Sequence, residues 1–382
     1  MEPTVLSIFG FCPNRVSTGI MYARELSAQL AARGWRSALC FLQPPCESVR
    51  RYLDAPNITL DVAPDTPALS QAAVGGVFEM LRRYRPRILH LHFTTFLNPY
   101  SWMAKLAGVE QVWFTDHTSQ PEGFVPSRAP LWKRLAVRVI HAPLTGVISV
   151  SAYGYHNFTV RDLLPKDRFH LVYNAVATDR AAAGTAHAAE FRHRHEIPAG
   201  RLVIAQVSWL RPEKGVDDLL LAARDVVAAE PLAHFVIAGD GAHQPNLEKL
   251  ARDLGIADHV TFTGVVQDPL AEGLFAASDI VCQMSRWEEV FGYVIAEAMA
   301  CSKPLVGTRA GGIPEVIQDG VTGFVVERRD TGAMSARILE LLRDPALRRR
   351  MGQAGLEVCR EKFELKKNVA QLLEIYGLST PA

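Results

Sequence analysis

The sequence predicts an α/β protein built from two doubly wound, Rossmann-like domains that face each other across a cleft. Three observations support this fold class. Short apolar, β-rich runs alternate with longer helical runs, a pattern typical of parallel sheets covered by helices on both faces. The alternation pauses after LVYNAV at residues 171–176 and restarts at Arg201. The length of 382 residues also suits two domains better than one small core.

The first domain is predicted to span residues 1–177. It contains three strand-like runs, TVLSIFGF, RILHLHF and QVWFT, and each is followed by a helical run: IMYARELSAQLAARG, PYSWMAKLAG and WKRLAVRVIHA. Residues 178–200 are rich in Ala, Gly and His and contain no strand pattern. We therefore interpret 178–200 as the linker between the two domains.

The second domain is predicted to span residues 201–362. Its strands are RLVIAQVSWL, HFVIAGDG, HVTFTGVV, DIVCQM and GFVVE, and the helical runs among them include VDDLLLAARDVVAAE, NLEKLARDLGI and LAEGLFAAS. Residues 363–382 read as a last helix with no strand after it. This helix therefore either packs on its own domain or crosses back to the first.

Composition and charge exclude several classes of protein. Apolar residues make up 48% of the chain, and no apolar run is long enough to span a membrane. The start MEPTVLSIFGF lacks an export signal, and the six cysteines show no Cys-x-x-Cys pair, so a cytoplasmic protein with reduced core cysteines is expected. The net charge of +1, with 18 Lys and Arg against 13 Asp and Glu in residues 1–179, is too weakly basic for a nucleic-acid partner. No Gly-x-Gly-x-x-Gly follows a first strand, which argues against a nicotinamide enzyme, and no cofactor is expected.

Ligands of open parallel sheets bind beyond the carboxyl ends of the strands, so motifs at those ends carry the functional argument. The first strand of the second domain runs into Arg211-Pro-Glu-Lys214-Gly215 before a helix. A cation pair on a loop that enters a helix can bind phosphate, because it combines charge with the free amides of the helix start. The alternative is a solvated turn whose charges have no ligand.

Two carboxylates, Glu289 and Glu297, flank a Phe-Gly pair in SRWEEVFGYVIAEAMACSKPLVGTRAGGIPEVI. If 291–301 is a helix and the region before it is helical too, eight residues separate the two backbones by about 12 Å and place the side chains on different faces. That is too far for a glycosidase pair, which works at about 5–9.5 Å. A better use is to hold hydroxyls at the two ends of a nucleotide diphosphate sugar, with the diphosphate on the amides of Val290, Phe291 and Gly292. The structural alternative is a first-turn acid and a solvated helix residue, although a Glu within YVIAEAMA needs a partner.

This segment resembles the donor site of the retaining, family-four glycosyltransferases of the GT-B fold, which carry Glu, seven residues, Glu, with Phe-Gly between. The resemblance is strong over residues 201–330, through RPEKGVDDLL, VIAGDG, HVTFTG, ASDIVCQMS and DGVTGFVV. It is weaker over residues 1–177, where RPRILHLH, FTDHTS, VISVSAYG and LVYNAV follow the family's order.

The resemblance implies a role for individual residues. Glu289 would contact the donor sugar, Glu297 the ribose, and Lys214 the diphosphate. His117 matches the histidine that faces the anomeric centre, which makes His117, Glu289 and Lys214 the predicted catalytic set. The remaining predicted donor contacts are Val265 and Val266 at the nucleobase, the amides of Val290, Phe291 and Gly292, Gly19 in the N-terminal loop, and Arg211, which is offered as the replacement for a family arginine found here as Trp209.

The implied activity is that of a retaining, metal-independent glycosyltransferase of the hexosyltransferase type, in which the departing phosphate accepts the acceptor's proton. The sequence contains no Asp-x-Asp motif of the kind that binds the metal ion in metal-dependent transferases. A UDP-sugar is the favoured donor and a GDP-sugar the alternative. A nucleotide-sugar epimerase of the same fold and a non-catalytic nucleotide-sugar-binding protein are the rival functions.

The acceptor is a hydroxyl of a glycan, of a lipid-linked molecule or of a small molecule. Trp132, Leu135 and Val139 alternate with basic residues in 127–140, which suits weak peripheral contact with a membrane at its inner face. The same pattern fits a helix that covers a sheet and keeps its charges in water, and this interpretation is preferred. The residues that could line an acceptor site near the end of a first-domain strand are His90, His92, Thr94, Thr95 and Trp102.

Overall fold

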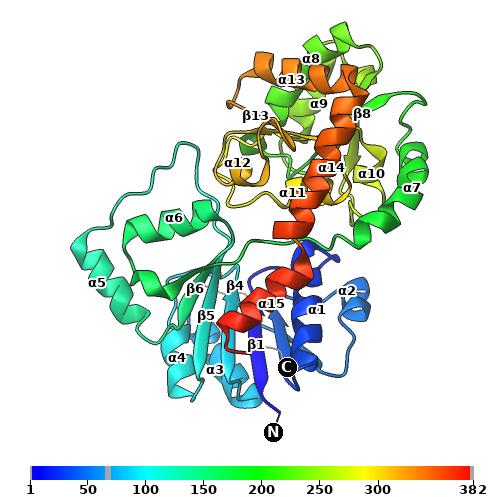
Figure 1. Cartoon of the computed structure of the whole chain (residues 1–382). Helices are drawn as coiled ribbons and strands as arrows, with labels where there is room; N and C mark the ends of the chain where they lie inside the picture. Colours follow the sequence, from blue (N-terminus) through cyan, green and yellow to red (C-terminus); the bar gives the residue numbers. More distant parts are fainter. Residues whose placement is uncertain (1, 65–69, 379–382) are drawn as a thin grey trace. The chain divides into compact units, whose positions relative to one another are not determined.

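The computed structural model describes residues 2–64 and 70–378, which form two compact units (Figure 1). The first unit contains the chain up to residue 118, residues 125–174 and the chain from residue 365 onward. The second unit contains residues 119–124 and 175–364. Each unit is built around one parallel sheet, so the α/β fold class predicted from the alternation of strands and helices is confirmed.

The first unit has a seven-stranded sheet in the order β3-β2-β1-β4-β5-β6-β7. The order reverses between β1 and β4, which are neighbours in the sheet. The strands are β1 Thr4–Phe9, β2 Arg36–Phe41, β3 Ile58–Val62, β4 Ile88–His92, β5 Gln111–Asp116, β6 Gly146–Ser149 and β7 Phe169–Leu171. The helices are α1 Thr18–Ala31, α2 Glu47–Tyr52, α3 Gln71–Tyr84, α4 Tyr100–Leu106, α5 Leu131–Ile140, α6 Ala152–Arg161 and α15 Leu365–Ile375.

The second unit has a six-stranded sheet in the order β10-β9-β8-β11-β12-β13. Here the order reverses between β8 and β11. The strands are β8 Leu202–Val207, β9 Ala233–Ala238, β10 Val260–Gly264, β11 Ile280–Gln283, β12 Leu305–Thr308 and β13 Gly323–Val326. The helices are α7 Arg180–Arg194, α8 Val216–Ala229, α9 Gln244–Asp253, α10 Leu274–Ala277, α11 Tyr293–Ala300, α12 Ile313–Val316, α13 Thr331–Arg343 and α14 Pro345–Lys362.

The central strands are buried on both faces, as expected for parallel sheets between helices, whereas the edge strands β3 and β10 are only partly buried. Along β1, Leu6 and Ile8 join one apolar cluster of the first unit, whereas Phe9 joins another. This alternation follows from the two-residue repeat of a strand, which sends successive side chains to opposite faces. The apolar runs read from the sequence therefore correspond to strands in the middle of a three-layer arrangement within each unit.

Residues 178–200, which the sequence analysis treats as a linker, contain α7 and belong to the second unit. Arg192 of α7 donates to the carbonyl of Ala277 at 2.6 Å, and a Cβ atom on Gly184 would lie 1.9 Å from the carbonyl oxygen of Leu270. Helix α7 therefore packs closely against α10 and the loop before it. An Ala- and His-rich composition with little apolar periodicity hides this contact, because the backbone and arginine contacts of α7 are joined by the buried ring of Phe191 rather than by a regular apolar face.

The C-terminal helix α15 belongs to the first unit, so the chain returns there after residue 364. Its hydrophobic residues Val369, Leu372 and Leu373 are buried. Beyond the helix, the hydroxyl of Tyr376 makes a short hydrogen bond with Nδ1 of His90 on β4. Of the two arrangements that the sequence leaves open for this helix, packing in the first unit is the one observed.

Helix α5 does not bury the face that the sequence analysis expects to cover the sheet. Its only buried residue is Val137, whereas Trp132, Leu135 and Val139 are exposed. The arginines are held instead, since Arg128, Arg134 and Arg138 all pair with the carboxylate of Asp162. The preferred interpretation of 127–140 therefore needs correction: the apolar side chains, rather than the charges, face outward. Among the residues that the structure describes, no helix has the length and apolar character needed to cross a bilayer.

Candidate functional site

The candidate site of the second unit lies where the strand order of its sheet reverses. Strands β8 and β11 run side by side, and the loops that leave their carboxyl ends carry Lys214 and Glu289. The ammonium nitrogen of Lys214 lies 2.5 Å from Oε1 of Glu289. Their side chains are 20% and 11% exposed, so the ion pair is largely shielded from water. In open α/β sheets, this reversal point is where ligands bind.

Lys214 is placed by a tight turn at the end of β8. Residues Pro212–Lys214 form a single 3-10 turn, and Gly215 follows in the left-handed region at φ 64°. A Cβ atom on Gly215 would lie 1.8 Å from the carbonyl oxygen of Met284, so only glycine lets this loop pass so close to the loop after β11. The buried side chain of Gln206 links the two loops, because it donates to the carbonyl of Lys214 at 2.9 Å and accepts the N–H of Met284 at 3.3 Å.

Glu289 is held by its own loop and by the loop after β12. Ser285 donates to Oε1 of Glu289 at 2.8 Å, and the N–H of Gly312 donates to the Glu289 carbonyl at 2.7 Å. A Cβ atom on Gly311 would lie 2.1 Å from that carbonyl oxygen. The AGG stretch of the sequence therefore lets a third strand-end loop lie directly against the backbone of Glu289.

Helix α11 begins two residues later than predicted. It spans Tyr293–Ala300, and Gly292 before it has φ 92°, so residues 289–292 are not helical. The backbone separation expected for a continuous helix between Glu289 and Glu297 therefore does not apply. Glu297 lies half-buried on α11 between buried Ala296 and Ala298.

The other predicted donor contacts of the second unit also follow strand ends. Val265 and Val266 come directly after β10; Val265 is exposed and Val266 is buried. Arg211 has an exposed side chain whose Nε lies 2.8 Å from the carboxylate of Glu213. The structure thus brings Lys214 and Glu289 into contact, while the guanidinium of Arg211 pairs with its neighbour on the turn.

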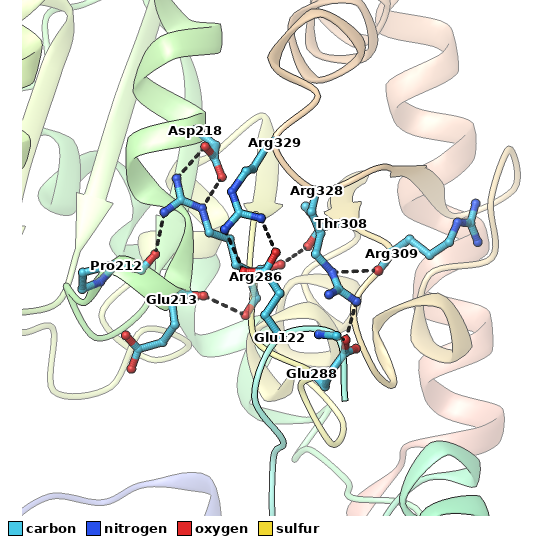
Figure 2. A network of polar contacts seen from close by, with 12 residues as sticks. Glu122, Pro212, Glu213, Asp218, Arg286, Glu288, Thr308, Arg309, Arg328 and Arg329 are labelled. Atoms are coloured by element: carbon cyan, nitrogen blue, oxygen red, sulfur yellow. Dashed lines mark hydrogen bonds and ion pairs between the residues drawn. The ribbon is translucent and has the colours of Figure 1, made fainter. Parts of the chain in front are cut away.

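Sequence reasoning missed the residue beside Glu289. Glu288 is 7% exposed at its side chain, and its carboxylate accepts from Arg328 at 2.6 Å, from the N–H of Gly311 at 2.7 Å and from the N–H of Gly123 at 3.0 Å. Figure 2 shows this carboxylate within a network that also contains Arg286 paired with Asp218. The sequence feature that could have indicated Glu288 is the Glu288-Glu289 pair itself, because two adjacent acids in a buried segment require two separate sets of partners.

In the first unit, His117 lies just beyond the carboxyl end of β5. Its ring stacks on Phe93 with a centroid distance of 3.7 Å, and Phe93 has φ 56° directly after β4. Neither ring nitrogen of His117 has a hydrogen-bond partner among the described residues, and the same holds for Nε2 of His92 and Oγ1 of Thr94. Buried polar atoms without partners are rare in folded proteins, so each calls for an explanation, such as a catalytic role or a bound water or ion. Burial lowers the pKa of His117 to about 3, so its ring is neutral near pH 7 and can both donate and accept.

The remaining candidates of the first unit differ in their accessibility. Both ring nitrogens of His90 are engaged in the core, by Thr115 at 2.7 Å and by Tyr376. Thr95 is exposed after β4. Trp102 on α4 is partly exposed, and its indole N–H donates to the carbonyl of Val139 at 3.0 Å. Gly19 lies in the first turn of α1 after the loop that follows β1.

Comparison with known proteins assigns both halves of the chain. Residues 188–358 match the family model described as glycosyl transferases group 1, and residues 21–180 match glycosyltransferase family 4. The chain is 30% identical over 310 residues to N-acetyl-alpha-D-glucosaminyl L-malate synthase of Bacillus anthracis, which covers 81% of this chain and 79% of that protein. It is 33% identical over 206 residues to a GDP-mannose-dependent alpha-(1-6)-phosphatidylinositol monomannoside mannosyltransferase of Mycolicibacterium smegmatis, covering 52% of this chain and 54% of that protein.

The fold has solved counterparts as well. The Anabaena protein HepE, solved in complex with UDP and glucose, superposes with a TM-score of 0.78 at 19% identity. The match covers 99% of this chain and all of the Anabaena chain. At this level of identity the similarity shows a shared fold of two Rossmann-like domains.

Proposed function

Because this chain belongs to the group 1 glycosyl transferases, a family of glycosyltransferases with the GT-B fold, we propose that it is a retaining, metal-independent enzyme of the hexosyltransferase type. It transfers a sugar from a nucleotide diphosphate sugar to an acceptor hydroxyl. A UDP-sugar is the favoured donor and a GDP-sugar the alternative; relatives and structural neighbours are named for GDP-mannose and UDP.

The observation that carries this proposal is the Lys214–Glu289 ion pair at the strand reversal of the second unit. A diphosphate is more highly charged than a carboxylate, so it competes for the ammonium group of Lys214. Glu289 is then free to accept hydrogen bonds from sugar hydroxyls. An ammonium group placed against the leaving diphosphate stabilises the negative charge that develops as the glycosidic bond breaks.

The rest of the donor is assigned to the strand ends around this pair. Glu297 on α11 accepts hydrogen bonds from the ribose, and Val265 and Val266 after β10 contact the base. The amides of Phe291 and Gly292 precede α11, where the N–H groups of a helix start are available to the diphosphate. The N–H of Val290, which was also predicted as a diphosphate contact, donates instead to the Ser119 hydroxyl at 3.2 Å. The exposed Arg211 and Gly19 at the start of α1 are further phosphate contacts in this proposal.

His117 is assigned to a hydroxyl of the donor sugar. Its two unpartnered ring nitrogens support this role, because a hydroxyl can satisfy one of them as donor or acceptor. The lowered pKa of His117 excludes a cationic role near neutral pH. Retention is proposed through front-face attack, in which the acceptor oxygen bonds to the anomeric carbon as the bond to phosphate breaks. The leaving phosphate oxygen takes the acceptor's proton.

The acceptor is proposed to be a hydroxyl of a glycan, a small molecule or a lipid-linked molecule. The exposed Trp132, Leu135 and Val139 of α5, next to three arginines that share one carboxylate, support the lipid-linked class. Such a helix would touch a membrane surface only peripherally. Cosedimentation with phosphatidylcholine vesicles, with and without phosphatidylglycerol, tests this contact. Binding that ignores the anionic lipid would contradict it.

The proposed activity is tested by a thermal-shift panel of UDP-, GDP- and ADP-sugars, since a ligand that binds only the folded state raises its stability by about 2.7 kcal/mol at 100 times Kd. One class should raise the Tm and the others should not. Slow hydrolysis of that donor in water, measured with and without EDTA, separates an enzyme from a binding protein. Absence of any shift, or a rate abolished by EDTA, would contradict the proposal.

Product stereochemistry tests the retaining mechanism. The anomeric configuration of the first sugar released, read by proton NMR before mutarotation, should equal that of the donor. An inverted product would contradict retention while leaving sugar transfer itself intact. Of the rival functions, the epimerase is not favoured, since the relatives from Bacillus anthracis and Mycolicibacterium smegmatis are named as a synthase and a mannosyltransferase.

A further inference from the structure

A short segment between β5 and α5 belongs to the second unit although both of its flanking elements belong to the first. We call residues 119–124 the strap. Gln120 and Glu288 pair in both directions, because the N–H of Gln120 donates to the Glu288 carbonyl at 3.0 Å and the N–H of Glu288 donates back at 2.9 Å. The strap therefore lies against the residue that directly precedes the proposed sugar ligand Glu289.

Two ion pairs fix the strap and its neighbour. Glu122 binds Arg329 through both carboxylate oxygens, with 2.7 Å between Nη2 and Oε2, and this pair lowers the pKa of Glu122. The Glu288 carboxylate, held by Arg328, also accepts the N–H of Gly123. Figure 2 shows the two adjacent arginines reaching their separate glutamates. A bidentate arginine contact has a defined geometry, so it sets the register of the strap as well as its position.

This register places Ser119 at the proposed donor site. Its hydroxyl oxygen accepts the N–H of Val290 at 3.2 Å and faces Oε2 of Glu289 at 3.5 Å. The other carboxylate oxygen, Oε1, is held by Lys214 and Ser285. The two oxygens of Glu289 thus have different partners, and the Ser119 hydroxyl is the group beside Oε2.

We propose that Ser119 is a positioning residue for Glu289 and the Val290 amide, and that the strap holds it there. This inference rests on the proposed function for the identity of the ligand. The hydroxyl limits rotation of the Glu289 carboxylate, so that Oε2 meets a sugar hydroxyl in one orientation. Because Ser119 acts at the sugar end of the donor, its loss should affect the sugar and spare the nucleotide.

The test compares Ser119→Ala with Ser119→Thr, which keeps the hydroxyl, and with Thr118→Ala, which removes the neighbouring exposed hydroxyl. Ser119→Ala should lower kcat/KM for the donor sugar by about 3- to 10-fold, the size of one ordinary hydrogen bond. Its affinity for UDP or GDP without the sugar, measured by calorimetry, should stay at the wild-type value. Ser119→Thr should restore most of the loss, and Thr118→Ala should show none. An unchanged or raised kcat/KM in Ser119→Ala, or an equal loss of nucleotide affinity, would overturn the proposal.

A second measurement needs no activity. Amide hydrogen exchange of the ligand-free protein should show faster exchange at Val290 in Ser119→Ala, with Gly312 unchanged because its N–H donates to the Glu289 carbonyl. Arg329→Gln should speed exchange in the strap, whereas Arg309→Gln, at an exposed pair with Glu327, should not. If wild-type protein transfers no sugar, the proposed function fails and this measurement still decides the role of Ser119. An unchanged Val290 rate in Ser119→Ala would refute that role.

Discussion

At the scale of single residues, the two glutamates of the spaced pair have different surroundings. Glu289 is enclosed by Lys214, Ser285 and Ser119, whereas Glu297 lies half-buried on the first turns of α11. The ammonium group of Lys214 can exchange the Glu289 carboxylate for a ligand's phosphate, which frees Glu289 for sugar hydroxyls, whereas Glu297 is proposed to accept hydrogen bonds from the ribose. We therefore expect the two residues to serve different steps.

Glu297→Ala should weaken binding of the free nucleoside diphosphate by about 10- to 100-fold, since a hydrogen bond to a charged group is worth about 1.5–3 kcal/mol. Glu289→Ala should chiefly lower kcat, by about 100-fold or more, as found for lost electrostatic groups at reacting centres. Calorimetry and donor turnover measure the two effects. The exposed Glu357→Ala on α14 is the matched control. Wild-type activity in both site variants would contradict the assignment.

Strand-end loops set the geometry at the scale of elements. Gly311 has φ 55°, and a Cβ atom there would collide with the Glu289 carbonyl at 2.1 Å. Gly320 has φ 74° but no atom within 4 Å of such a Cβ. A comparison of alanine substitutions at these two glycines separates steric contact from backbone strain, because both positions have a backbone conformation that disfavours alanine and only Gly311 is crowded.

Gly311→Ala should therefore destabilise the second unit by about 2–4 kcal/mol, and Gly320→Ala by about 1 kcal/mol. Urea unfolding, monitored by amide hydrogen exchange in peptides of the second unit, gives the free energy of unfolding of each variant. Gly311→Ala should also reduce donor binding, since Glu289 must shift to make room. Equal free energies of unfolding for the two variants would show that the loop after β12 can move away without cost.

The buried histidines on β4 and directly after β5 predict that the stability of the first unit depends on pH. Burial lowers the pKa of His90 and His117 to about 3 and that of His92 well below its usual value. Below pH 6.5 these histidine rings are protonated in the unfolded chain but stay neutral in the folded protein. The free energy of unfolding therefore falls as the pH drops, by about 1.4 kcal/mol per pH unit for each ring. Burial raises the pKa of Asp116 to about 6, so protonation of this carboxyl stabilises the folded state as the pH falls from 6 to 3.8. Over that range this gain offsets the loss of stability caused by about one histidine ring.

His117→Phe should keep the stack on Phe93 and remove one of these rings. The free energy of unfolding of the first unit, measured between pH 6.5 and 4.5, should then fall less steeply by about 1.4 kcal/mol per pH unit. Phe93→Leu changes the same stack without a titrating group and should leave the slope unaltered. A His117→Phe slope equal to that of the wild type would mean that the ring is protonated in the folded state.

For the whole molecule, the chain changes unit four times, at 118/119, 124/125, 174/175 and 364/365. The last change sends α15 into the first unit. Stopping the chain after Glu364 removes Leu365, Val369, Leu372, Leu373 and Tyr376, all buried. At about 1.5–3 kcal/mol for each side chain, the loss is comparable with the whole stability of a typical domain.

Truncation after Glu364 should therefore unfold the first unit and leave the second unit folded. Limited proteolysis should cut residues 2–118 rapidly and spare 175–364. Tyr376→Phe, which removes only the hydroxyl bound to His90, should lower first-unit stability by about 1 kcal/mol and serve as the mild control. Protection of both units in the truncated chain would show that α15 is dispensable.

The α/β class and the alternation of strands with helices were predicted from the sequence, because the long, apolar central elements carry their own period. The runs named as strands correspond to β1, β4 and β5 in the first unit and to β8, β9, β10, β11 and β13 in the second, whereas β2, β3, β6, β7 and β12 were not named. The sequence also placed Lys214, Glu289 and His117 at strand ends. The predicted start of α11 was two residues too early, because Gly292 at φ 92° lets the chain stay non-helical through a segment whose composition favours a helix. Likewise, the Ala- and His-rich composition of α7 gave no indication that it packs in the second unit.

Which strand ends become neighbours could be seen only in the folded arrangement of the sheets. The adjacency of β8 and β11 brings Lys214 to Glu289 across 75 residues of sequence, and no local pattern encodes that pairing. The same holds for the strap and for α15, which join units far from their sequence neighbours. Local periodicity specifies elements, whereas sheet order and the partners of buried charges depend on contacts between distant residues, which form only when the whole core is assembled.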